Sequence, residues 1–126
     1  MQVLRQDATD ELELSGPVDE LRRLASALRS GRTAQPLDTS GDPAPYDRAL
    51  SSLETARTSG GVAVRHSADG EVLTIEGGPD QLAVLAEVFE DFADEGDLFA
   101  HLHLEYLPDH EFLSPRTQPL VVALTA

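Results

Sequence analysis

The chain has 126 residues, with nine basic side chains against 23 acidic ones and a formal net charge of −14. This length supports a single domain, residues 1–126, with one hydrophobic core. The charge argues against binding to a nucleic-acid backbone or an anionic membrane surface, since both need clustered Lys and Arg. Cysteine is absent, which excludes disulfides and thiolate chemistry. The chain start lacks the features of a signal peptide, and no apolar run reaches the ~20 residues that cross a bilayer, so we expect a cytoplasmic protein.

The first half predicts a β-β-α-β arrangement. A strand is expected at residues 2–6, and a second ends at Gly16, because apolar and polar residues alternate before it. A helix is expected at 17–29 and a third strand at 53–57. The connection at 31–49 is long and contains several Pro and Gly residues, so we interpret it as a flexible loop.

The second half predicts the same order of elements. Its helix at 79–94 begins with Pro79 and Asp80, which suit the first helical turn. The loop at 107–119 contains Phe112 and Leu113, which suggests that it folds back on the domain. The other expected elements are a strand at 62–66, a hairpin turn at 67–70, a strand ending before Gly77, a strand at 101–106 and a final strand at 120–125.

The two halves form an internal repeat with an offset of 61 residues, visible when residues 12–28 are laid over residues 73–89. We interpret the chain as two tandem β-β-α-β units, with repeat one at 1–58 and repeat two at 59–106. A C-terminal loop and strand follow, at 107–126. Both helices carry an apolar stripe that must be covered by a sheet. The expected fold class is therefore α+β, a two-layer sandwich of one mainly antiparallel sheet with two helices on one face.

The negative charge is concentrated in the second half of the chain. Between Arg65 and Arg116 there are 13 carboxylates and no basic side chain. One group of them lies on the outward face expected for helix 79–94, and its members are Glu87, Glu90, Asp91, Asp94 and Glu95. Two interpretations stay open for this face: an ordinary solvated helix surface, or an electrostatic docking surface for a partner.

One further constellation could carry chemistry, the sequence HLHLEY at 101–106. On a strand, His101, His103 and Glu105 share one face, and His110 follows in the next loop. These are ligand types for a divalent metal such as zinc, so a metal-binding protein or metal-dependent enzyme is one hypothesis. The alternative is a polar recognition face, with Leu102, Leu104 and Tyr106 packed beneath the helices. The sequence contains no nucleophile elbow and no phosphate-binding loop, which favours a non-enzymatic protein without a cofactor.

The segment at 101–122, with the strand and helix before it, resembles the immunity protein 32 family over about residues 60–123. The resemblance rests on the His-x-His-x-Glu strand, on His110 and on the Pro-Leu-Val-Val sequence that begins at Pro119. It implies a small bacterial immunity protein of a polymorphic toxin system, which binds and neutralises a cognate toxin. The toxin would be basic if the acidic surface binds it. The expected partner-binding residues are Glu87, Glu90, Asp91, Asp94, Glu95, His101, His103, Glu105, Asp109 and His110.

A third hypothesis is self-association. A homodimer would have to keep the acidic helices of its two copies apart, because each copy carries a net charge of −14. It would pair through the less charged sheet face or through edge strands.

Overall fold

The computed structural model describes all residues, 1–126, and contains two helices and nine strands. The helices are α1 (Val18–Ser30) and α2 (Pro79–Glu95), and neither is long and apolar enough to cross a membrane. The strands are β1 (Gln2–Arg5), β2 (Leu12–Gly16), β3 (Thr33–Pro36), β4 (Arg48–Ala49), β5 (Ser52–Arg57), β6 (Ala63–His66), β7 (Val72–Gly77), β8 (His101–Leu104) and β9 (Leu120–Leu124). The fold is α+β, as predicted, and both predicted helices are present.

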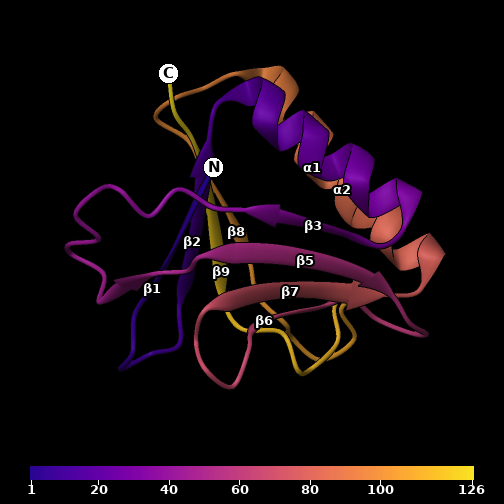
Figure 1. Cartoon of the computed structure of the whole chain (residues 1–126). Coiled ribbons are helices and arrows are strands. Elements are labelled where there is room, and N and C mark those ends of the chain that lie inside the picture. Colours follow the sequence, from indigo (N-terminus) through magenta and orange to yellow (C-terminus); the bar gives the residue numbers. More distant parts are fainter.

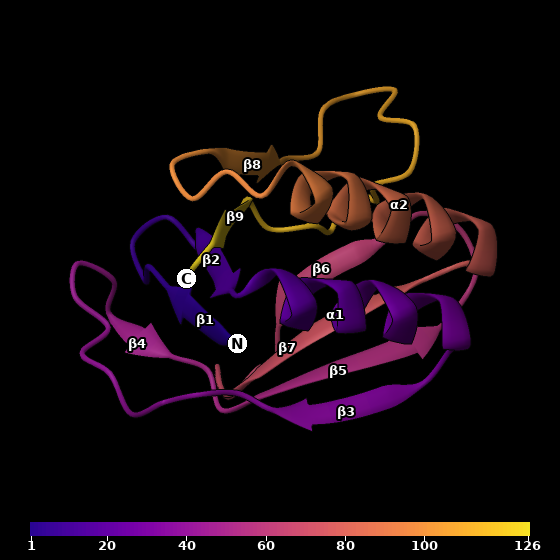
Figure 2. The ribbon, with the colours of Figure 1, turned by 90° about the horizontal axis from the view of Figure 1, so that it is seen from above.

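The expectation of one sheet is wrong, because the strands form two separate mixed sheets. One sheet has the strand order β4-β1-β2-β9-β8, and the other has the order β3-β5-β7-β6. The strands of the two sheets run in clearly different directions in Figure 1. Helices α1 and α2 lie side by side above the four-stranded sheet, as Figure 2 shows. Each sheet contains one parallel pair, β2 with β9 and β5 with β7, and the other pairs are antiparallel.

The two sheets share a pattern of pairing that follows the sequence offset. In the hairpin β1-β2, Val3 lies opposite Leu14, and in β6-β7 the residues 61 positions later, Val64 and Ile75, lie opposite each other. The strand that joins each hairpin in parallel comes from the other half of the chain, because β9 joins β2 and β5 joins β7. The β-β-α-β units are therefore not self-contained. Strands β3 and β5 of repeat one join the sheet of β6 and β7, and β8 of repeat two joins the sheet of β1 and β2.

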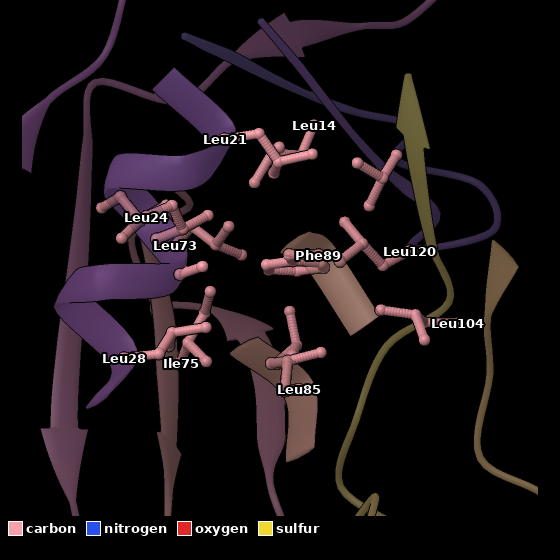
Figure 3. Close-up of a cluster of buried hydrophobic side chains, with 14 of the residues drawn as sticks. Leu14, Leu21, Leu24, Leu28, Leu73, Ile75, Leu85, Phe89, Leu104 and Leu120 are labelled. Carbon is pink, nitrogen blue, oxygen red and sulfur yellow. The ribbon is translucent and has the colours of Figure 1, made fainter. Parts of the chain in front are cut away.

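One core of 26 buried residues connects both sheets to both helices. In Figure 3, Phe89 of α2 lies in the middle, with Leu73 and Ile75 of β7 on one side and Leu104 and Leu120 on the other. Helix α1 contributes the apolar stripe of Leu21, Leu24 and Leu28, all at most 1% exposed. Burying side chains of this size stabilises the fold by about 1.5–3 kcal/mol each.

The connection at 31–49 contains two strands that its composition did not predict. Strand β3 pairs with β5, and the two-residue strand β4 pairs with β1. Between them, Leu37 is buried and Tyr46 donates a hydrogen bond to a Glu11 carboxylate oxygen 3.3 Å away. Burial, with the nearby Glu13 and Glu11 carboxylates, raises the pKa of Tyr46.

The loop at 107–119 folds back onto the edge strand β6. The N–H group of Val62, just before β6, donates to the Phe112 carbonyl at 2.7 Å, and the Gln118 N–H group donates to the Val64 carbonyl at 2.8 Å. Phe112 and Leu113 are buried in the core, which agrees with the sequence expectation. The loop thereby covers the β6 edge of the four-stranded sheet. At β8, an edge strand of the five-stranded sheet, no segment outside the sheet forms a backbone hydrogen bond with the strand.

Candidate functional site

The five acidic residues of α2 from Glu87 to Glu95 lie in two rows, and the row that faces α1 is neutralised. Glu90 Oε1 lies 2.5 Å from Nη2 of Arg29, and Asp94 Oδ1 lies 2.8 Å from Nη2 of Arg22. The hydrogen bond from Arg29 to Glu90 raises the pKa of the Arg29 guanidinium. Arginines from the first half of the chain therefore oppose two of the carboxylates that appear unopposed along the sequence.

The second row carries unbalanced negative charge. Glu87, Asp91 and Glu95 follow each other at intervals of four residues, which places them on one face of α2. All three side chains are exposed, and none forms an ion pair. Of the five acidic positions predicted on this helix, these three form no ion pair, but Glu87 also helps to raise the pKa of Arg29, so Asp91 and Glu95 carry the charge that is most available to a partner.

A groove runs between the outer side of α2 and strand β8. Its volume is about 360 Å³, and it is lined by Val88, Asp91, Phe92, Glu95, Ala100, His101 and Leu102. The apolar lining residues pack against the core, so they form a hydrophobic floor beside the Asp91 and Glu95 carboxylates. The groove brings Asp91 and Glu95 together with His101, three of the residues that the sequence analysis singled out for partner binding.

The predicted histidine strand is shorter than expected. Strand β8 ends at Leu104, so Glu105 lies beyond it. His101 and His103 are exposed on β8, with ring centroids 6.4 Å apart at an interplanar angle of 63°. Their exposure and the burial of Leu104 agree with the polar-face interpretation.

The four residues proposed as metal ligands do not form a common site. No group of three or more His, Asp or Glu side chains is placed to hold a metal ion. The Nδ1 atom of His110 accepts hydrogen bonds from the N–H groups of Phe112 and Leu113, at 3.2 and 3.0 Å. Since both donors need the lone pair of Nδ1, that nitrogen stabilises the loop rather than offering itself as a ligand.

Asp109 and His110, the last two predicted partner-binding residues, lie in the loop after β8 and do not line the groove. Asp109 is exposed and has a positive φ of 68°. Asp and Asn tolerate this left-handed conformation better than most side chains, so Asp109 suits the turn that it occupies.

Sequence reasoning missed the exposed apolar residues at the end of the groove. Leu98 is 48% exposed and Phe99 is 95% exposed, in the loop between α2 and β8. A pattern of apolar residues normally signals burial, so it gave no sign that these two side chains point into solvent. Their position two and three residues after the C-terminal cap Gly96 was the available signal that they lie outside the helix.

Comparison with known proteins identifies one relationship. No curated protein and no solved structure matches the chain. A family model described as Immunity protein 32 matches residues 72–125, which include β7, α2, β8 and β9. Every residue that lines the groove lies within this segment. Over residues 72–125, the chain is thus similar to the immunity protein 32 family, as its sequence motifs suggested.

Proposed function

We propose that the chain is a bacterial immunity protein that binds a cognate toxin and neutralises it without catalysis. The similarity of residues 72–125 to the Immunity protein 32 family supports this role. We infer that the chain binds the toxin electrostatically from the row of unpaired carboxylates on α2, Glu87, Asp91 and Glu95. This row lies within the segment that matches the family. The chain acts in the cytoplasm and needs no metal or cofactor.

The charge of the chain favours a basic toxin. A net charge of −14 creates a negative potential that accelerates the encounter with a cationic protein, particularly at low ionic strength. The arginines Arg22 and Arg29 neutralise the side of α2 that faces α1, which leaves Asp91 and Glu95 as unpaired carboxylates on the side that faces β8. An inhibitor with such a face would bind over a cationic cleft and block it.

Two experiments test this function. The genes that flank the one for this chain are searched for a toxin domain, which is then expressed alone and together with the chain while bacterial growth is followed. We expect growth arrest with the toxin alone and growth with both proteins. Calorimetry of the purified pair at low salt should then show a one-to-one complex. Continued arrest on co-expression, or no binding heat, would contradict the proposal.

A further inference from the structure

The most unusual surface feature of the molecule is an exposed aromatic side chain beside a groove. Only four large apolar residues are substantially exposed, and two of them, Leu98 and Phe99, are neighbours in the α2–β8 loop. The next residues, Ala100 and His101, already line the groove. Large apolar side chains exposed together mark interaction surfaces, and aromatic residues are prominent among those that dominate binding energy.

The loop that carries Phe99 is held by its own hydrogen bonds. Gly96 ends α2 in a left-handed conformation, and its N–H group donates to the Ala93 carbonyl at 3.1 Å. The Phe99 N–H group donates to the Asp97 carboxylate at 2.8 Å, and the Ala100 N–H group donates to the Asp97 carbonyl at 3.4 Å. These bonds hold the backbone at Phe99, which lowers the cost of ordering the loop when a partner binds.

The groove itself has the chemistry to bind a long cationic side chain. Val88, Phe92 and Leu102 offer an apolar surface to the methylene stem of an arginine or lysine. Asp91 and Glu95 lie one helical turn apart on the same wall, and neither forms an ion pair within the chain. Such carboxylates form strong charge-assisted hydrogen bonds with a guanidinium group.

We propose that the Phe99 loop and the α2–β8 groove together form the centre of the toxin interface. Phe99 enters an apolar depression on the toxin, while an arginine or lysine of the same toxin surface lies in the groove against Asp91 and Glu95. This inference rests on the proposed function and adds to it the part of the surface that binds and the chemistry of the partner surface.

The test measures the affinity of four variants for the toxin domain of the neighbouring gene by calorimetry. Phe99→Ala removes the aromatic anchor, and the double variant Asp91→Ala/Glu95→Ala removes the groove carboxylates. Leu107→Ala is the apolar control, since Leu107 is 62% exposed in the loop after β8 and does not line the groove. Glu54→Ala/Glu71→Ala is the charge control, because both residues are exposed, unpaired and outside α2.

We expect Phe99→Ala and the groove double variant each to raise the dissociation constant by about 30-fold or more, as loss of a binding hot spot does. Each control should change it by less than about 3-fold. Hydrogen exchange should also show new protection of the amides from Leu98 to Leu102 when the complex forms. Thermal unfolding of all four variants checks that each retains the fold.

The outcomes separate this inference from the function on which it rests. If the unaltered chain forms no complex, the proposed function fails. If the unaltered chain binds but the Phe99 and groove variants bind as tightly as their controls, the function stands and the proposed interface is wrong. A loss with Phe99→Ala and none with the groove double variant would contradict the cationic partner side chain.

Discussion

Arg29 of α1 and Glu90 of α2 form an ion pair across the two helices, and they lie 61 residues apart, the same offset as the internal repeat. Two residues at equivalent positions therefore meet each other where α1 packs against α2. In a symmetric contact, such a position would meet an identical residue. Here the two halves differ in sequence, and the opposite charges of Arg29 and Glu90 turn a potential repulsion into an attraction.

The first prediction concerns this pair. Arg29→Glu should destabilise the fold because it places two carboxylates at the contact, and the double variant Arg29→Glu/Glu90→Arg should restore much of the loss. Urea unfolding of both variants measures the change. High salt should reduce the difference, since both side chains are partly exposed. Equal stability of the single and double variants would show that the pair is not coupled.

The second prediction compares two phenylalanines of the same segment. Phe89 is fully buried between both sheets and α1, so Phe89→Ala should destabilise the fold by about 3–5 kcal/mol. Phe99 is 95% exposed, so Phe99→Ala should change the free energy of unfolding by less than about 0.5 kcal/mol. Urea unfolding at one temperature gives both values. A large loss of stability with Phe99→Ala would mean that Phe99 packs against the fold and is not free for a partner.

The third prediction uses two glycines at equivalent ends of β2 and β7. A Cβ atom at Gly77 would lie 3.0 Å from the Cα atom of Val62, a backbone atom that cannot move alone. At Gly16 the nearest atom would be the Glu20 carboxylate oxygen at 3.1 Å, which is ion-paired with the amino group of Met1 but lies at the end of a flexible side chain that can shift by a few tenths of an ångström. Gly77→Ala should therefore destabilise by about 1–3 kcal/mol, clearly more than Gly16→Ala. Equal losses in chemical unfolding would contradict this explanation.

The fourth prediction is that the purified chain carries no stoichiometric metal. The candidate ligands do not converge, and the Nδ1 atom of His110 accepts two backbone hydrogen bonds. Elemental analysis after purification without a histidine tag should find zinc, iron, manganese and nickel well below one equivalent. Added zinc should leave the melting temperature unchanged. One equivalent of metal, lost together with stability in His101→Ala, would support the metal hypothesis.

Much of the secondary structure follows from local sequence patterns. Both helices begin and end within a residue of their predicted limits, because the apolar stripe, the first-turn Pro and Asp and the C-terminal glycine all act locally. The two-sheet arrangement could not be predicted in this way. Strand β9 pairs with β2, more than 100 residues earlier, and no local pattern specifies such a partner.

The candidate site was predictable only where it depends on local sequence patterns. The acidic face of α2 is a local pattern, and three of its five predicted carboxylates are unpaired. Which carboxylates face the arginines of α1 depends on how the helices pack, so the pairs of Arg22 and Arg29 could not be read from spacing. The exposure of Phe99 depends on the direction in which the chain leaves α2, which a pattern of residue types does not encode.

The most direct measurement for the proposed function is the association rate constant of the chain with the neighbouring toxin domain, followed from low to high salt. The triple variant Glu87→Lys/Asp91→Lys/Glu95→Lys reverses the unpaired row of α2. Its control, Asp42→Lys/Glu54→Lys/Glu71→Lys, changes the net charge equally at three exposed residues outside α2. We expect the α2 variant to slow association at low salt by about 10-fold or more and to weaken the salt dependence, with a much smaller effect for the control. Identical rate constants for the two variants, or no complex with the unaltered chain, would contradict the account.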